Sequence, residues 1–195
     1  MSFDERAGVW DSSGRRQELA DAVAKAISER IELKGSFNLL DVGAGTGLLT
    51  RRLLPYVSTV TGVDSSKGML EKFAELGERA TGVQSDILSF VSDRKFDGIV
   101  SSMTLHHIED TEALFRKLHS LLKPGGFIAL ADLAPEDGSF HEQGNEGVFH
   151  FGFDEESLKS PADAAGFLDP CYRIVHNIEK ENGRTYGVFL FTAEA

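Results

Sequence analysis

Three glycines at alternating positions are the first residues of this chain that can do chemistry. Gly43, Gly45 and Gly47 follow directly on the apolar run of residues 39–42, and a helical apolar pattern starts at Leu48. This order predicts a buried strand, a tight turn and a helix. Glycine lets the backbone approach a ligand closely, and the helix start offers unpaired N–H groups. The turn is therefore a candidate ligand site; the alternative is a plain connection between strand and helix.

Acidic residues lie at the ends of the expected strands. Asp64 closes the β-branched run of residues 57–64. It stands 21 positions after Gly43, close to the roughly 20 positions typical of an acid that contacts a nucleoside ribose. An ionised carboxylate can accept hydrogen bonds from both vicinal hydroxyls. Asp41 and Asp86 lie at the same expected edge. Each acid alone can also be a helix cap or turn residue; together they indicate a ligand site that would repel a pyrophosphate.

A pair of histidines follows the fourth expected strand. His106 and His107 come after the segment FDGIVSS, at the edge where Rossmann-like sheets bind their ligands. A histidine there can act as a general base when the nucleophile still carries its proton. The alternative is that one ring only braces the loop. Both residues are catalytic candidates.

Alternating strands and helices position these residues. Apolar and β-branched runs predict strands, and amphipathic segments predict the helices between them. The expected strands cover residues 39–42, 57–64, 80–84, 96–102 and 127–133. This alternation implies right-handed crossovers and an α/β, Rossmann-like, mostly parallel sheet with helices on both faces. Residues 171–178 and 183–192 predict a closing antiparallel hairpin around a turn that contains Asn182.

Three segments flank this core. Residues 15–31 predict an amphipathic helix, preceded by a short charged arm whose Phe3 and Trp10 either pin it to the domain or close over a ligand. The connection 135–153 is long, and its four phenylalanines favour a lid or acceptor loop over disorder. After it, Pro161 and a fresh capping sequence predict two short helices rather than one.

Composition limits the classes of function. The chain has 195 residues, enough for one domain with a sizeable core, and carries a formal net charge of −11. This charge argues against nucleic-acid and anionic-membrane partners and favours a small molecule. Cys171 is the one cysteine, so an intrachain disulfide and a thiolate metal cluster are excluded. Without a signal segment or a run long enough for a bilayer, we expect a soluble, cytoplasmic protein.

Taken in order, several segments resemble the class I S-adenosylmethionine-dependent methyltransferases. They are LLDVGAGTG, VTGVDSSKGML, SDIL, FDGIVSSMTLHHIED and LLKPGGFIALADL. The resemblance implies a seven-stranded sheet ending in the antiparallel hairpin, S-adenosylmethionine as cofactor and S-adenosylhomocysteine as product. The implied enzyme is a methyltransferase that passes the methyl group to a small-molecule acceptor by in-line displacement. In such a reaction the protein supplies alignment and excludes water.

The same resemblance assigns roles to residues. The methionine end of the cofactor lies on the first turn, the ribose on Asp64, the adenine beside Met69 with its amino group on Asp86, and the sulfonium near Ser102. The implied cofactor-binding residues are Asp41, Gly43, Ala44, Gly45, Gly47, Asp64, Ser65, Met69, Asp86, Ile87 and Ser102. Candidates for the acceptor side are Trp10, His141, Phe149 and His150.

The resemblance also divides the single expected domain into four parts. These are an N-terminal arm and helix (1–36), a cofactor-binding core (37–133), a lid or acceptor loop (134–153), and C-terminal helices with the hairpin (154–195).

Other functions fit the sequence less well. An NAD-dependent oxidoreductase would carry a third glycine of the dinucleotide fingerprint at position 48, which is Leu48. The chain has no Asn-Pro-Pro-Tyr sequence after the fourth strand, which counts against methylation of nucleic-acid amino groups or protein glutamine. A non-catalytic protein that binds S-adenosylmethionine stays open, because no residue is an unambiguous catalytic group. No metal is expected, because the H-E-x-x-H imitation that starts at His141 has Asn145 in place of the second histidine.

Overall fold

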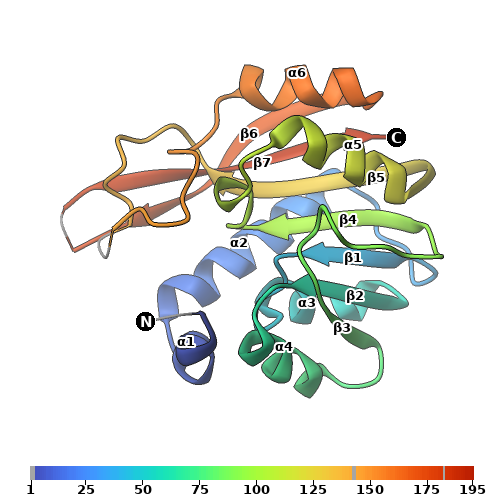
Figure 1. Cartoon of the computed structure of the whole chain (residues 1–195), viewed down its shortest axis with the longest axis horizontal. Coiled ribbons are helices and arrows are strands. Elements are labelled where there is room, and N and C mark those ends of the chain that lie inside the picture. The colour runs from blue at the N-terminus through green and yellow to red at the C-terminus, as the bar shows by residue number, and fades with distance from the viewer. Residues whose placement is uncertain (1–2, 142–143, 182) are drawn as a thin grey trace.

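One seven-stranded sheet runs through the protein in the order β3-β2-β1-β4-β5-β7-β6 (Figure 1). The computed structural model describes residues 3–141, 144–181 and 183–195. The strands are β1 (Asn38–Val42), β2 (Thr59–Asp64), β3 (Ala80–Gln84), β4 (Phe96–Ser102), β5 (Leu122–Leu133), β6 (Leu168–Glu179) and β7 (Thr185–Glu194). β1 to β5 pair in parallel, and β7 runs antiparallel to both β5 and β6. The Rossmann-like fold with a closing antiparallel hairpin is therefore confirmed.

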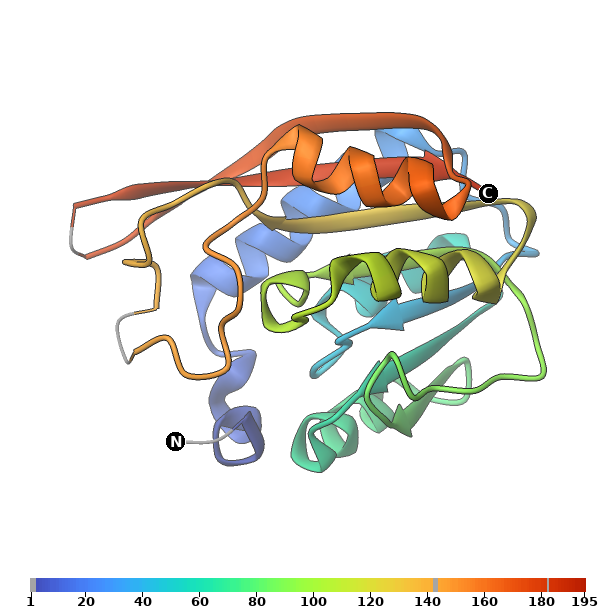
Figure 2. The ribbon, with the colours of Figure 1, turned by 45° about the horizontal axis from the view of Figure 1, so that its top comes forward.

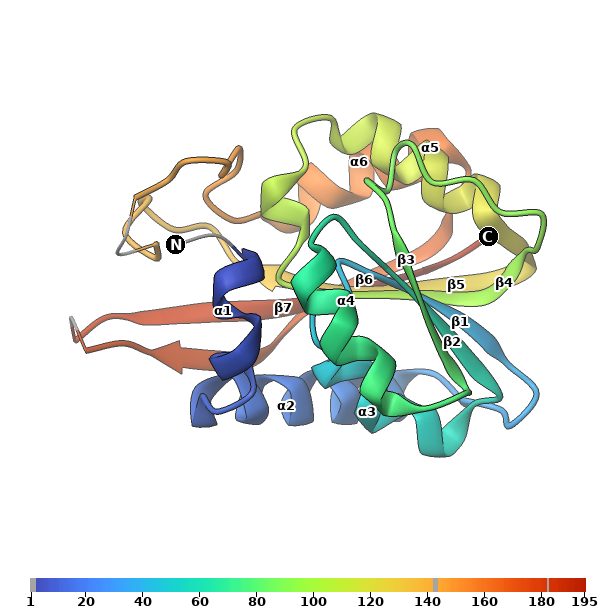
Figure 3. The same ribbon diagram turned by 60° about the horizontal axis from the view of Figure 1, so that its bottom comes forward.

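Helices cover both faces of this sheet (Figure 3). The helices are α1 (Phe3–Trp10), α2 (Gly14–Arg30), α3 (Leu48–Leu53), α4 (Lys67–Phe73), α5 (Thr111–Leu121) and α6 (Glu155–Ala165), with short 3-10 turns η1 (Leu54–Tyr56), η2 (Ala74–Leu76) and η3 (Leu105–His107). One apolar core joins the sheet to α2, α3 and α4, and a second joins the opposite face to α5 and α6.

Neighbouring residues of one strand serve the two cores. Leu39 faces the first core and Leu40 the second, because successive side chains of a strand point to opposite faces. In β4, Val100 and Ile99 divide in the same way, and all four side chains are fully buried. Burial on both faces explains why adjacent positions of these strands are both apolar.

The carboxyl ends of the parallel strands meet at one edge of the molecule. The strand order reverses between β1 and β4, which are neighbours although two strands lie between them in the chain. In open α/β sheets ligands bind at such a reversal. Figure 2 shows α1 and the described parts of the connection 134–153 at this same edge.

The N-terminal segment forms a helix, α1, where a charged arm was expected. Tertiary contacts explain the difference: the Asp4 carboxylate accepts hydrogen bonds from the Ser66 hydroxyl (2.6 Å) and from the Gly68 backbone N–H (2.8 Å). Both partners belong to the connection from β2 to α4, far along the chain. The sequence of the N-terminal segment itself does not indicate these contacts.

The expectation of two short helices around Pro161 is wrong, because α6 runs through it as one helix. A proline inside a helix removes one backbone hydrogen bond. Here the Pro161 ring is buried beside Leu158 and Ala162, so apolar burial offsets that loss. The Asp154 side chain caps the helix by accepting from the Ser157 N–H at 2.9 Å.

Strand β5 begins earlier than expected, at Leu122, and includes the Pro-Gly-Gly sequence. Gly125 donates its N–H to the Ala195 carbonyl (2.7 Å), and the Ala195 N–H donates to the Gly126 carbonyl (2.8 Å). A register shift against β4 between Phe96 and Gly98 accommodates the extension. These two hydrogen bonds pair Ala195 with a segment that is typical of a turn.

Candidate functional site

The glycine turn after β1 combines two packed glycines with one that faces open space. All three have positive φ: +65° at Gly43, +55° at Gly45 and +85° at Gly47. An added Cβ at Gly43 would lie 2.0 Å from the Thr104 hydroxyl, and one at Gly47 would lie 2.5 Å from Leu76, whereas at Gly45 it would meet nothing within 4 Å. Packing therefore explains two of the glycines, and Gly45 leaves a cradle of bare backbone.

Asp64 joins this turn to the next loop. Its Oδ2 accepts from the Gly45 N–H and its Oδ1 from the Ser66 N–H, both at 2.8 Å. The side chain is half-buried at the end of β2. The carboxylate expected to bind a ribose thus stands beside the Gly45 cradle in a fixed orientation.

Asp41 lies behind the turn rather than in the open. It is 2% exposed, and its Oδ2 accepts from the Thr50 hydroxyl at 2.6 Å. Burial raises the pKa of Asp41 to about 7; the Asp64 charge adds to this effect, and the Thr50 hydrogen bond opposes it. Asp41 is therefore half-protonated near neutral pH in the ligand-free protein.

Replacing Asp41 by asparagine should raise the stability of the ligand-free protein at high pH. The folded pKa lies above the unfolded value of 3.8, so the contribution of Asp41 is most favourable below pH 4 and is lost as pH rises through 7. Asparagine mimics the neutral form and keeps an acceptor for Thr50. We expect Asp41→Asn to gain about 1–3 kcal/mol at pH 8, and about a third of that gain at pH 5, in urea unfolding.

The control for this prediction is Asp163→Asn, which removes the same charge from an exposed position on α6. It should not change the pH dependence of stability. If the unfolding free energies of the wild type and Asp41→Asn depend on pH in the same way, the pKa of Asp41 is not raised in the folded protein.

The residues expected around an adenine lie along β2, β3 and α4. Met69 is 2% exposed, and its N–H donates to the Ser66 hydroxyl at 3.2 Å. Asp86 is exposed after β3, and its Oδ1 accepts from the Leu88 N–H at 2.8 Å. Of the other expected cofactor-binding residues, Ser65 is exposed, Ala44 and Ile87 are buried, and Ser102 is half-buried at the end of β4.

Sequence reasoning did not single out Met103, which follows Ser102 with a φ of +59°. Positive φ is uncommon outside glycine and costs energy, and such residues cluster at ligand sites. The Met103 N–H donates to the Ala131 carbonyl of β5 at 2.9 Å, which holds the chain in this bend. The local sequence does not predict the bend, because the hydrogen bond to β5 is a contact between distant parts of the chain.

The N-terminal segment contacts both the glycine turn and the loop after β2, which the sequence did not indicate. Asp11, just after α1, accepts from the Thr46 hydroxyl of the glycine turn at 2.5 Å, while Asp4 holds the loop after β2. Trp10 packs under the Arg16 guanidinium, 3.7 Å from its ring centroid, and its carbonyl accepts from the same group at 3.1 Å. These two contacts tie Trp10 to the start of α2.

His106 is buried and paired with a carboxylate. Its ring Nδ1 lies 2.6 Å from Oδ1 of Asp132, and the two side chains are 2% and 0% exposed. Asp132 also accepts from the backbone N–H groups of His106 (3.2 Å) and Leu133 (2.7 Å). Asp132, at the end of β5, is a further functional candidate; its sequence signal is an acid inside an apolar strand.

Three histidine rings meet at the ends of β4 and β5. The His107 Nδ1 lies 2.7 Å from the Gly147 carbonyl. Ring centroids are 4.1 Å apart for His106 and His107, 5.1 Å for His106 and His141, and 5.8 Å for His107 and His141. Burial, and then the charges of His106 and His107, lower the pKa of His141 to about 4. His141 is thus neutral at pH 7.

The other acceptor-side candidates lie outside this cluster. His150 Nε2 lies 3.0 Å from the Ile108 carbonyl, so that the ring ties the connection to the segment after η3. Phe149 is 52% exposed, and its N–H donates to the His106 carbonyl at 2.9 Å. The H-E-x-x-H imitation cannot be followed fully, because Glu142 and Gln143 lie outside the described residues.

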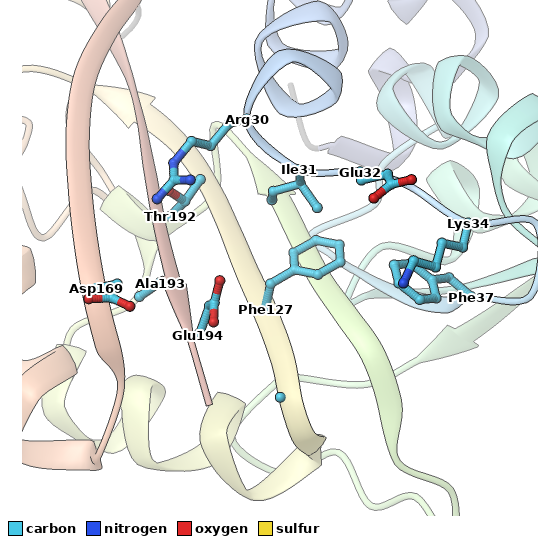
Figure 4. A pocket seen from close by; sticks show the side chains of 11 residues that line it. Arg30, Ile31, Glu32, Lys34, Phe37, Phe127, Asp169, Thr192, Ala193 and Glu194 are labelled. Carbon is cyan, nitrogen blue, oxygen red and sulfur yellow. The ribbon is translucent and has the colours of Figure 1, made fainter.

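A separate cavity lies at the opposite edge of the sheet (Figure 4). It has a volume of about 270 Å³ and lies between the end of α2 and the amino ends of β1 and β5, beside Arg30, Phe37 and Phe127. Parallel sheets bind ligands at the other edge, and none of the site residues expected from the sequence lines this cavity. It is not part of the candidate site. No helix among the described residues is long and apolar enough to cross a membrane.

Comparisons with known proteins identify the family of this chain and support its fold. Residues 40–130 match the family model described as a methyltransferase domain. An uncharacterized methyltransferase of a Geobacillus species is 31% identical, over 94% of this chain and 88% of that protein. An uncharacterized methyltransferase of Schizosaccharomyces pombe is 36% identical over 61% of this chain, which spans about half (49%) of its length. The solved structure described as a DhpI–SAH complex has a TM-score of 0.78 at 21% identity, covering 98% of this chain and 92% of that one. The chain therefore belongs to the class I S-adenosylmethionine-dependent methyltransferases.

Proposed function

We propose that this protein transfers the methyl group of S-adenosylmethionine to a small-molecule acceptor by in-line displacement. The observation that carries the proposal is the Gly45 cradle, which has open space where a Cβ would stand and the Asp64 carboxylate beside it. When bound, the cofactor supplies an activated methyl group and leaves as S-adenosylhomocysteine. The protein binds, aligns and excludes water.

The charges at this edge suit that cofactor. S-adenosylmethionine carries a sulfonium and an ammonium but no phosphate, and Asp41, Asp64 and Asp86 supply negative charge. In Asp64 each oxygen accepts one backbone N–H; since a carboxylate has about four lone-pair sites, capacity remains for both ribose hydroxyls. Cofactor binding would also favour the ionised form of Asp41, so affinity should rise with pH near 7.

The acceptor side is assigned to the ends of β4 and β5. In our proposal residues 37–133 hold the cofactor and the connection 134–153 covers the acceptor. The backbone of this connection is tied to His106 through Phe149 and to Ile108 through the His150 ring. A net charge of −11 supports a small-molecule acceptor rather than a nucleic acid.

His106 and His107 are the candidates for taking a proton from the acceptor. In each ring Nδ1 lies against an oxygen, from Asp132 and from Gly147 respectively. If Nδ1 carries the hydrogen, Nε2 is left as the basic atom, as a general base requires. A base is needed only for acceptors that are still protonated at the working pH.

A binding experiment separates the main alternatives. Calorimetric titration should show binding of S-adenosylmethionine and S-adenosylhomocysteine but not of NAD; binding of NAD alone would overturn the proposal. Product formation across small hydroxyl, amine, thiol and carboxylic acceptors separates an enzyme from a non-catalytic binding protein. Cofactor binding without product from any acceptor class would favour the second.

Asp64→Asn should weaken S-adenosylhomocysteine binding by about tenfold to a hundredfold, because charge-assisted hydrogen bonds contribute about 1.5–3 kcal/mol. In wild type, the Asp64 oxygens accept hydrogen bonds from two backbone N–H groups. The asparagine NH₂ group is a donor, so it would lose one of these two hydrogen bonds. Calorimetry measures the change, and Asp163→Asn is the control of equal charge. An unchanged dissociation constant would place Asp64 outside the cofactor site.

A further inference from the structure

The three-histidine cluster of His106, His107 and His141 has the composition of a metal centre. One ring nitrogen of each residue lies within 4.8 Å of the other two. The first two residues come from η3 and the third from the connection after β5, so the fold, not a short motif, brings them together. Imidazole nitrogen is a preferred ligand of zinc and related divalent transition metals.

The surroundings of the first two rings match the outer partners of metal-bound histidines. Such a histidine commonly donates its second ring N–H to a carboxylate or a backbone carbonyl, which fixes the ring and its tautomer. His106 has the buried Asp132 carboxylate at 2.6 Å, and His107 has the Gly147 carbonyl at 2.7 Å. Both contacts use Nδ1, and in the proposed site Nε2 of each ring is the ligand atom.

His141 supplies the third ligand, from the connection after β5. Its Nδ1 is buried and has no hydrogen-bond partner among the described residues. A buried polar atom without a partner is costly, and a metal ion would satisfy it.

Distance and charge also allow a metal here. In a tetrahedral zinc site with Zn–N bonds of about 2.0–2.1 Å, the ligand nitrogens lie about 3.4 Å apart. The ring nitrogens, now within 4.8 Å of one another, need to approach by at most about 1.4 Å. Asp132 supplies one buried negative charge, whereas Lys180, over the Phe140 ring at 4.3 Å, opposes it with a positive one.

We propose that His106, His107 and His141 bind one divalent transition-metal ion of the zinc class. Three protein ligands leave a fourth position for water or a substrate atom. Asp132 is a positioning residue that acts through His106. With the metal bound, Nε2 of His106 and His107 is a ligand and does not act as a general base. The proposal does not depend on methyl transfer, because metal binding is measured directly.

The test uses the full chain without an affinity tag, dialysed against a chelator. Titration with Zn²⁺ in competition with a chromophoric chelator should show one equivalent bound, and Co²⁺ should give the visible absorption of a tetrahedral nitrogen-ligated site. His141→Ala should weaken binding by about a hundredfold or more, and Asp132→Asn by about tenfold to a hundredfold. The control His176→Ala removes a histidine on β6, outside the cluster.

The outcomes decide the proposal in both directions. Circular dichroism in the chelator identifies a variant that has not folded; His107→Ala then replaces it, with the same expected loss. Equal Zn²⁺ affinity in the wild type, His141→Ala and His107→Ala would overturn the proposal. So would displacement of Co²⁺ by an equal concentration of Mg²⁺, a hard cation that prefers oxygen ligands.

Discussion

Gly45→Ala should weaken cofactor binding by up to about a hundredfold while leaving the fold largely intact. A Cβ at this position meets no protein atom within 4 Å, so it would stand in the space assigned to the cofactor. The φ of +55° is strained for alanine, which costs about 1–2 kcal/mol of stability. Binding is affected separately. A steric clash between the new Cβ and the cofactor costs up to about 3 kcal/mol of binding free energy, which is about a hundredfold in affinity.

The matched control is Gly43→Ala, two positions earlier in the same turn. Its φ of +65° gives similar strain, but its Cβ would lie 2.0 Å from the Thr104 hydroxyl. This variant should lose clearly more stability in urea unfolding than Gly45→Ala, because the short Thr104 side chain must move. If Gly45→Ala binds S-adenosylhomocysteine as the wild type does, the cofactor does not lie on this turn, whatever the effect of Gly43→Ala.

His106→Ala should lower the free energy of unfolding by about 3 kcal/mol or more. The substitution leaves a cavity at a position that is 2% exposed. It also takes the closest side-chain partner, at 2.6 Å, from an Asp132 carboxylate with no exposure to water. Urea unfolding in the presence of a chelator measures the loss without any contribution from bound metal. The control His176→Ala should cost much less, since that residue is only half-buried.

A double-mutant cycle assigns the effect to the pair. Asp132→Asn removes the charge that His106 shields, so the double variant should be destabilised by at least about 1 kcal/mol less than the sum of the single variants. Additive effects within about 0.5 kcal/mol would mean that the two side chains do not interact energetically, whatever their distance.

Much of the fold could be predicted from the sequence because its signals are local. The continuous apolar runs of β1 and β4 indicate strands buried on both faces, and the positive φ at Gly43, Gly45 and Gly47 is a backbone state that glycine alone adopts without strain. Asp64 was placed by its position at a strand end, since the carboxyl ends of parallel strands meet at one edge.

Other elements differ from the sequence prediction because distant contacts outweigh local preference. α1 is helical against the loops that Asp4 and Asp11 hold. α6 continues through Pro161 because the ring is buried. β5 begins before its Pro-Gly-Gly sequence because the C-terminal Ala195 pairs with it.

By itself, the sequence determined the alternation of strands and helices, the glycine turn and the acids of the cofactor edge. Only the tertiary structure decided the arrangement at the ends of β4 and β5: it buried Asp132 against His106 and brought His141 to His106 and His107 from a different loop. The physical reason is that hydrophobic periodicity and turn chemistry act between neighbours in the chain. The meeting of three rings from two loops depends on how the packed sheet places the ends of β4 and β5.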